Sequence, residues 1–227
     1  MNRKTILFLI IISVSALLIQ CKKETLPPVD FHHDYFPLEI GHYLIWDVDS
    51  VVYDDFTGTV DTFYYQVKEL VESEFVDGDG LASYRLERYI RFDDEEEWSI
   101  KNIWKARIDG ARALKTEENI TFIKLAFPPE NNKTWDGNAY NAMNEQTYVY
   151  QDVHESFFIN GLYVDSTVTV LQKDFETLIS EDYQMEVYAK DIGLIYKKYV
   201  ELTKEVDGTI IRGVDYSYTL QLYGMTY

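Results

Sequence analysis

Cysteine is nearly absent from this chain of 227 residues, in which Cys21 is the only one. A single thiol cannot close an internal disulfide, and it excludes the sites that hold structural zinc with several cysteines. The stability of the folded chain must therefore come from a hydrophobic core. A chain of this length can bury roughly 70% of its unfolded surface as one domain.

Apolar runs long enough to cross a membrane as a helix are also lacking. The longest, Ile6 to Leu18, has 13 residues and is interrupted by Ser13 and Ser15, whereas a spanning helix needs about 20 apolar residues. Arg3 and Lys4 precede it and supply a short positive region. A short apolar run after positive charge is typical of a secretory signal that is removed.

Two processing sites compete at the end of this signal. Val14-Ser15-Ala16 has small residues that suit an ordinary signal peptidase, and cleavage there would leave a free thiol. Leu18-Ile19-Gln20-Cys21 resembles a bacterial lipobox, in which the thiol receives a diacylglyceryl group and the cysteine becomes the first residue. We predict a signal over residues 1–20, a lipidated Cys21 with an extended linker over 21–35, and a domain over 36–227. Two or three acyl chains anchor a protein stably, so we expect the protein to reach the membrane through this lipid.

Basic residues are scarce. The chain has 21 Lys and Arg against 39 Asp and Glu, which gives a formal net charge of -18. Binding to nucleic acid needs basic residues that displace counterions from phosphates, so nucleic acid is excluded as a partner. A basic face that would lie on anionic lipid is excluded for the same reason. The remaining partners are the membrane, through the lipid anchor, and envelope proteins or glycans.

Catalytic and metal-binding motifs are absent. The four histidines accompany no nucleophile elbow, and His32-His33-Asp34 lies in the expected linker without the spacing of a metal site. Asp77-Gly78-Asp79-Gly80 does not follow the register of a calcium loop, and we predict a hairpin turn there. The acidic run at residues 93–97 is typical of a solvated loop. We therefore predict no catalytic residue, no metal site, no cofactor and no enzymatic activity.

A two-residue alternation of apolar and polar side chains fills the chain from Phe36 onward. Leu44, Trp46 and Val48 alternate with Asp47 and Asp49, as expected of a half-buried strand. Further strands are expected at 62–70, 83–92, 100–108, 120–127, 147–153, 164–172, 183–190, 193–203 and 215–223. Turn dipeptides lie between several of them, at 77–80, 109–110, 160–161 and 207–208. Helical turns are expected only at 138–146 and 174–179. The sequence thus predicts a mainly β domain, a single antiparallel, strongly curved sheet or a partly closed barrel or half-barrel.

Three stretches carry a resemblance to a known group: YFPLEIGHYLIWDVD, LAFPPENNKTWDGN and EDYQMEVYAKDIGLIYKKYVEL. They resemble a group of uncharacterised Bacteroidota lipoproteins anchored through a lipobox, and the likeness covers nearly the whole mature chain. It implies a place in the cell envelope at the outer membrane, on either face, and no particular activity. The segment VYAKDIGLIYK is similar to strand pairs in lipoproteins whose half-barrel surrounds a hydrophobic groove. Gly193 within it interrupts a strand pattern and predicts a bulge.

Aromatic residues are abundant, with 19 Tyr, 12 Phe and 4 Trp. Tyr and Trp are favoured in strands for packing, and they also form platforms for sugar rings. Trp135, expected in an exposed loop, is the candidate ligand-binding aromatic.

Taken together, the sequence predicts a non-catalytic, lipid-anchored binding or assembly protein that acts through surface contacts, with a largely self-filled sheet and at most a shallow groove. The alternative is a half-barrel carrier of lipid or another hydrophobic ligand. A carbohydrate-binding module and a hydrolase are further alternatives.

Overall fold

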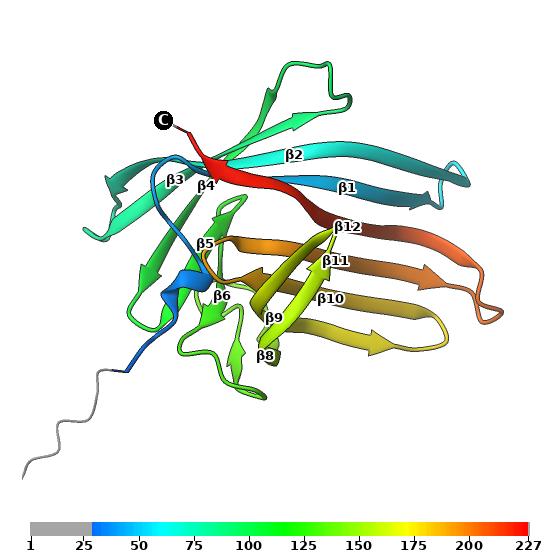
Figure 1. The fold of residues 1–227 in the computed structure, drawn as a ribbon. Coiled ribbons are helices and arrows are strands. Elements are labelled where there is room, and N and C mark those ends of the chain that lie inside the picture. The colour runs from blue at the N-terminus through cyan, green and yellow to red at the C-terminus, as the bar shows by residue number, and fades with distance from the viewer. Residues whose placement is uncertain (1–28, 227) are drawn as a thin grey trace, which may run out of the picture. The chain divides into compact units, whose positions relative to one another are not determined.

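The structure, a computed structural model, describes residues 29–226, and a compact unit begins at Phe31. One short 3-10 helix precedes twelve strands (Figure 1). The elements are η1 (His33–Tyr35), β1 (His42–Asp54), β2 (Thr59–Val76), β3 (Ala82–Arg91), β4 (Ser99–Asp109), β5 (Arg112–Glu117), β6 (Ile120–Ala126), β7 (Thr134–Asp136), β8 (Thr147–Ile159), β9 (Leu162–Glu176), β10 (Ser180–Ala189), β11 (Gly193–Lys204) and β12 (Ile210–Met225). Among these residues no helix is long and apolar enough to cross a membrane.

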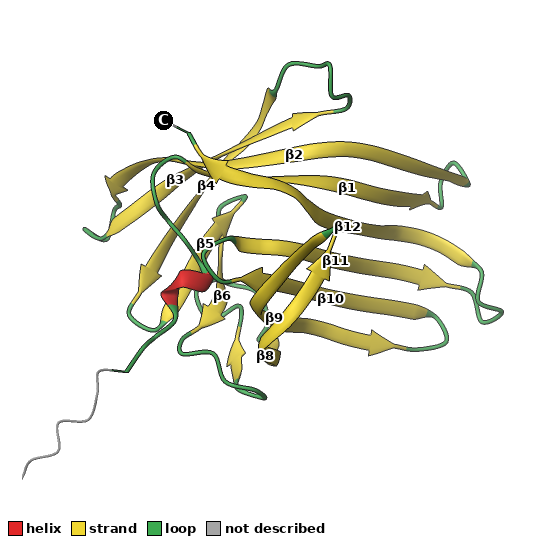
Figure 2. Cartoon of the chain, in the orientation of Figure 1, coloured by secondary structure: helices red, strands yellow, loops and turns green. Residues whose placement is uncertain are grey.

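All twelve strands belong to one antiparallel sheet (Figure 2). Its order is β6-β5-β4-β3-β2-β1-β12-β11-β10-β9-β8-β7, so each half of the chain forms a run of neighbouring hairpins. Strands β1 and β12 join the two halves along a register that runs from His42↔Met225 to Tyr53↔Gly213. The fold class predicted from the sequence is confirmed.

The two ends of the sheet meet. The backbone N–H of Ile123 in β6 donates to the carbonyl of Gly137, directly after β7, at 2.9 Å. The indole N–H of Trp135 in β7 returns a hydrogen bond to the Ile123 carbonyl at 2.9 Å, and Asn141 Nδ2 donates to the Thr121 carbonyl at 2.9 Å. These bonds connect the first strand of the order to the last and curl the sheet into a partly closed barrel, which leaves fewer unpaired edge groups.

The alternation seen in the sequence produces the core. Leu44, Trp46 and Val48 are buried and pack with residues of β2, β10, β11 and β12, including Val67, Val187, Ile195 and Leu220. A second buried cluster gathers Tyr35, Leu125, Tyr150, Val168 and Tyr188 among others. Both clusters consist of side chains far apart in the sequence, so the closure of the sheet assembles the core.

The end of the expected linker belongs to the domain. Tyr35 is fully buried, and its hydroxyl lies 2.7 Å from both His154 Nδ1 and Ser166 Oγ. Asp34 forms an ion pair with Lys190 at 3.3 Å. Residues 32–35, which the sequence assigned to the end of the linker, therefore contact the folded domain, because a buried tyrosine anchors this segment to β9 and its neighbours.

The strands predicted from the sequence are present, although their bounds differ from the predicted ranges. The turns predicted at residues 77–80, 109–110, 160–161 and 207–208 each join two strands. Strands β5 and β7 were not predicted, since both are short. The helical turns expected at 138–146 and 174–179 are wrong: the first segment forms hydrogen-bonded turns, and the second begins as the end of β9.

Gly193 is the first residue of β11, with φ of +95°. Its Cα partner is Ala189, so it closes the tight β10–β11 hairpin. The register shift predicted at Gly193 lies two residues further along, where Leu194 and Tyr196 pair with consecutive residues of β10. Gly193 thus supplies the positive φ that the hairpin requires, and the bulge follows it.

Candidate functional site

The curled sheet contains a cavity of about 440 Å³. Its wall includes residues from the segment after η1 and from β1, β2, β3, β4, β5, β6, β10, β11 and β12. The prediction of a self-filled domain with at most a shallow groove is therefore wrong. Side chains fill the interior of a barrel of about eight strands, whereas a wider sheet of twelve strands leaves space within it.

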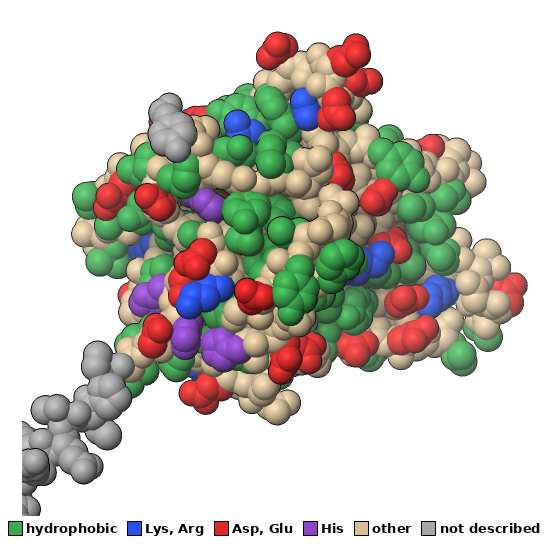
Figure 3. Space-filling view, viewed as in Figure 1, with side chains coloured by type: hydrophobic (Ala, Val, Ile, Leu, Met, Phe, Trp, Pro, Cys, Tyr) green, Lys and Arg blue, Asp and Glu red, His purple; other side chains and the backbone are tan. Residues whose placement is uncertain are grey.

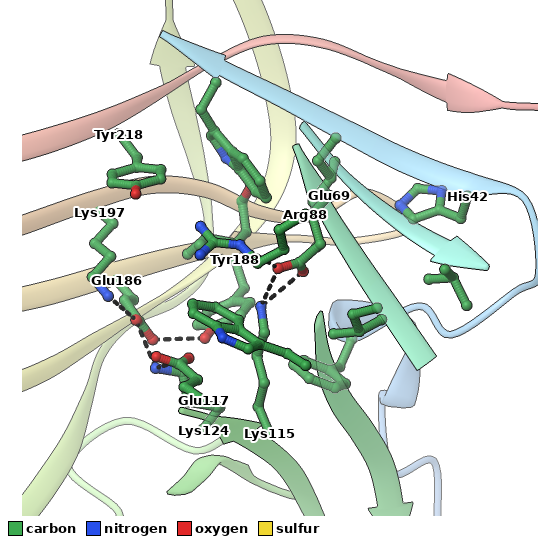
Figure 4. Close-up of a pocket in the computed structure, with 18 of the residues that line it drawn as sticks. His42, Glu69, Arg88, Lys115, Glu117, Lys124, Glu186, Tyr188, Lys197 and Tyr218 are labelled. Carbon is green, nitrogen blue, oxygen red and sulfur yellow. Dashed lines mark hydrogen bonds and ion pairs between the residues drawn. The ribbon is translucent and has the colours of Figure 1, made fainter. Parts of the chain in front are cut away.

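Four ionised side chains form one group in the wall, which we call the Glu186 cluster: Glu117, Lys124, Glu186 and Lys197 (Figure 4). Lys124 and Glu186 are buried, and the other two are half-buried. Lys124 Nζ lies 2.8 Å from Glu186 Oε1 and 3.3 Å from Glu117 Oε1. Lys197 Nζ lies 3.4 Å from Glu186 Oε1. The second oxygen of Glu186 accepts hydrogen bonds from Tyr188 at 2.7 Å and from Gln172 at 2.9 Å. Every charge in this cluster has a partner of opposite sign.

Sheet register brings the cluster together. Glu186 in β10 is directly opposite Lys197 in β11, and Lys197 is directly opposite Tyr218 in β12. Directly opposite residues share a face of the sheet, so one row of cross-strand neighbours carries these side chains inward. Lys124 lies where the β5–β6 register shifts, between Ile123 and Leu125.

The pairing holds these groups in their charged forms. Burial by itself would raise the pKa of Glu186, but the charges of Lys124 and Lys197 and its hydrogen bonds outweigh burial and lower the pKa to about 2. Burial would lower the pKa of Lys124, yet Glu117 and Glu186 raise it above its usual value. The pKa of Lys197 is raised in the same way, against burial and mainly by Glu186. None of these three groups is poised to exchange a proton near neutral pH.

A second group of charges, the Arg88 cluster, consists of Glu69, Arg88 and Lys115, all of which line the cavity. Lys115 Nζ donates to both carboxylate oxygens of Glu69, at 2.7 and 2.9 Å. Arg88 is directly opposite Glu69 in the β2–β3 register, and its Nε lies 3.2 Å from Glu69 Oε2. The Arg88 guanidinium carbon lies 3.7 Å from the centroid of the Trp104 ring, in cation–π geometry. Two cations thus share one carboxylate.

Another part of the wall is apolar and aromatic. It includes Leu44 and Trp46 of β1, Tyr218 of β12 and Ile192 of the β10–β11 turn. The Trp46 and Tyr218 rings meet edge to face with centroids 6.0 Å apart, and the Trp46 indole N–H donates to the Leu194 carbonyl at 2.9 Å. These contacts fix the orientation of the aromatic rings, so the cavity has both a charged and an apolar wall.

Trp135, the candidate ligand-binding residue predicted from the sequence, is not among the residues that line this cavity. Cys21 lies outside the described residues. Trp135 is half-buried rather than exposed: its ring packs against Tyr148 and Tyr150 and its N–H is bonded to Ile123. The expectation of an exposed aromatic is wrong because Trp135 lies in β7, the strand that closes the sheet against β6, and a ligand-binding role for Trp135 stays a prediction.

The acidic motif at residues 77–80 has structural contacts. Asp77 Oδ1 accepts backbone hydrogen bonds from Asp79 and Leu81, which makes it the organiser of the β2–β3 turn. Across residues 29–226 no three His, Cys, Asp or Glu side chains are grouped so that they could hold a metal ion.

The sequence analysis missed the cavity residues. Their signal is weak: Lys124 stands between the apolar residues Ile123 and Leu125, and Glu186 stands between Met185 and Val187. A charge inside an apolar strand indicates an internal polar cluster, but only the register shows which charges meet.

Comparisons with known proteins add little to this site. No protein-family model matches the chain, and no curated protein sequence matches it. Among solved structures, the chain is similar to a provisionally assigned lipoprotein of Parabacteroides distasonis, with 12% identity, a TM-score of 0.43 and coverage of 87% of this chain and 100% of the other. It is also similar to a provisionally assigned exported protein of Bacteroides fragilis with a YmcC-like fold, with 13% identity, a TM-score of 0.43 and coverage of 83% and 98%. Identities and TM-scores this low do not establish a family or a function.

Proposed function

We propose that this chain is a non-catalytic, lipid-anchored protein of the cell envelope that binds a small molecule in the cavity. The cavity is the observation that carries the proposal. Its volume of about 440 Å³ lies within the range of roughly 300–1,000 Å³ that is usual for small-molecule sites. A protein that acts through surface contacts alone has no need of such a space, so the carrier alternative is favoured over the surface module.

The state of the charged groups supports binding over acid–base catalysis. A general acid or base works best when its pKa is near the operating pH. The pKa of Glu186 is lowered to about 2, whereas the pKa values of Lys124 and Lys197 are raised. These groups serve as fixed charges that orient a ligand.

The envelope location rests on the signal and the lipobox-like residues before Cys21. The lipid anchor is tested by comparing the parent chain with Cys21→Ser in cells fed radiolabelled palmitate. We expect label and membrane association in the parent only, with the parent in the outer-membrane fraction. Equal labelling of the two proteins would contradict the anchor.

The binding function is tested by native mass spectrometry of the full chain released from its own membranes. We expect a retained small molecule in a ratio of one per chain. Leu194→Trp, in the cavity wall, should abolish retention, because the larger side chain occupies the space. Leu222→Trp is the matched control, since Leu222 is exposed on β12, and it should retain the molecule. Loss in both variants, or retention in both, would contradict a ligand held in the cavity.

A further inference from the structure

The cavity wall carries a surplus of positive charge. Five cationic and four acidic side chains line it, which leaves an excess of one positive charge. The whole chain has a formal net charge of -18, and acidic side chains are spread over the outer face seen in Figure 3. A positive interior in an acidic protein favours an anion at this place over one on the outer surface.

The surplus is located at the Arg88 cluster. In the Glu186 cluster two lysines balance two glutamates, and outside both clusters Lys101 is balanced by Glu118. Figure 4 labels the members of both clusters. In the Arg88 cluster, Lys115 already occupies both oxygens of Glu69. Arg88 and Lys115 therefore share the single carboxylate of Glu69, which leaves this cluster with one positive charge in excess.

Arg88 is buried with its hydrogen-bonding capacity poorly used. The residue is 5% exposed. Its Nε has no hydrogen-bond partner despite the nearby carboxylate of Glu69, and Nη1 makes only a 3.4 Å hydrogen bond to Asn102 Oδ1. A buried charged donor without a well-aligned acceptor is costly, and native proteins retain few of them. An acceptor supplied from the cavity would remove that cost.

A guanidinium selects the shape of its acceptor. Its planar fork of N–H groups matches carboxylate, sulfonate and phosphate oxygens, two at a time. The Trp104 ring, 3.7 Å from the guanidinium carbon, holds that plane in position. The wall formed by Leu44, Trp46, Ile192 and Tyr218 offers an apolar surface for the rest of the ligand.

We infer that the cavity binds a small organic anion, with its acidic group at Arg88 and its apolar body against Trp46 and Tyr218. This inference rests on the proposed function and names the ligand class of the same site. It differs from the hydrophobic-carrier alternative, which requires no charge on the ligand.

Two probes that differ by one acidic group test the inference. Anilinonaphthalene sulfonate carries a sulfonate on a flat aromatic body, and N-phenyl-naphthylamine is the same body without it. The full lipidated chain is held in neutral maltoside micelles on one side of a dialysis membrane, with an equal concentration of micelles on the other side. Uptake by micelles then cancels, and the excess on the protein side measures binding to the chain.

We expect the sulfonate to bind saturably, at one per chain, and about tenfold or more tightly than the neutral probe, as befits a charge-assisted hydrogen bond. Arg88→Met should lower sulfonate affinity by about tenfold or more and leave the neutral probe unchanged. Arg88→Lys keeps the positive charge but lacks the planar guanidinium, so it should show a loss of sulfonate affinity between those of the parent and Arg88→Met. This variant serves as the test if Arg88→Met fails to fold. Arg212→Met removes an arginine outside the cavity and should change neither probe.

Three results would overturn the inference. They are equal affinity for the two probes, full sulfonate affinity in folded Arg88→Met, and no binding of either probe. In each case a molecule retained in native mass spectrometry leaves the binding function standing. If no molecule is retained and neither probe binds, the proposed function fails as well.

Discussion

Lys124 and Glu186 form an ion pair at 2.8 Å in which the two side chains are 6% and 1% exposed. Charges this deeply buried lose nearly all contact with water, a loss that only close pairing and additional hydrogen bonds offset. Here Tyr188, Gln172 and a second lysine complete the shell of the carboxylate. The Lys124–Glu186 ion pair therefore maintains the charged wall of the cavity only while all the side chains that contact it are present.

Removal of the central carboxylate should be strongly destabilising. Glu186→Gln leaves Lys197 without its nearest counter-charge, and we expect a loss of about 3–5 kcal/mol in the free energy of unfolding, measured by urea titration. Glu74→Gln, at an exposed position of β2, should change stability by less than about 0.5 kcal/mol.

Adding Lys197→Met to Glu186→Gln should recover part of the loss, because the uncompensated charge is then gone. A double variant whose loss equals or exceeds that of Glu186→Gln alone would contradict this explanation.

Acid should destabilise the protein over a defined interval of pH. The folded-state pKa of Glu186 is about 2 against an ordinary value of 4.5. A lowered pKa contributes stability that is fully present above about 4.5 and is lost as the pH falls toward 2, since the unfolded chain takes up the proton first. Glu186 should contribute on the order of 3 kcal/mol to this fall. Urea titrations from pH 6 to pH 2 should show a shallower fall in Glu186→Gln, and an identical pH dependence in the two proteins would count against the lowered pKa.

Gly193 should tolerate no branched side chain. Its φ is +95°, and a Cβ would lie 3.4 Å from Pro37 Cδ and 3.6 Å from Leu44 Cδ1. We expect Gly193→Val to lower the free energy of unfolding by about 1–3 kcal/mol. Gly78→Val is the control, because Gly78 is in a turn with open space around it and no positive φ. Equal stability of the two variants would show that the hairpin does not depend on the glycine.

The indole of Trp135 should stabilise the seam between β6 and β7. Trp135→Phe removes its hydrogen bond to the Ile123 carbonyl, which we expect to cost about 0.5–1.5 kcal/mol for the bond itself. Hydrogen exchange at the Ile123 amide, which bonds across the same seam to Gly137, should become faster. Trp98→Phe, outside the seam, should leave that amide unchanged, and equal protection in both variants would contradict the role of Trp135.

The strands could be predicted because apolar and polar side chains alternate, as in Leu44 to Asp49, and because turn dipeptides such as Asn160-Gly161 separate them. The closure of the sheet could be expected from the number of strands, whereas the pairing of β1 with β12 could not, since the two are at opposite ends of the domain. The cavity could not be predicted either, because its wall combines strands that are far apart in the sequence. The apolar neighbours of Glu186 and Lys124 indicate an internal polar cluster, but only strand register and closure show that these two residues are partners, as are Glu69 and Arg88.

A crystal structure of the protein with anilinonaphthalene sulfonate bound tests the ligand class of the cavity most directly. We expect sulfonate oxygens within hydrogen-bond distance of the Arg88 guanidinium and the aromatic rings against Trp46 and Tyr218. Probe density confined to the outer surface, or rings in the cavity with the sulfonate directed away from Arg88, would contradict it.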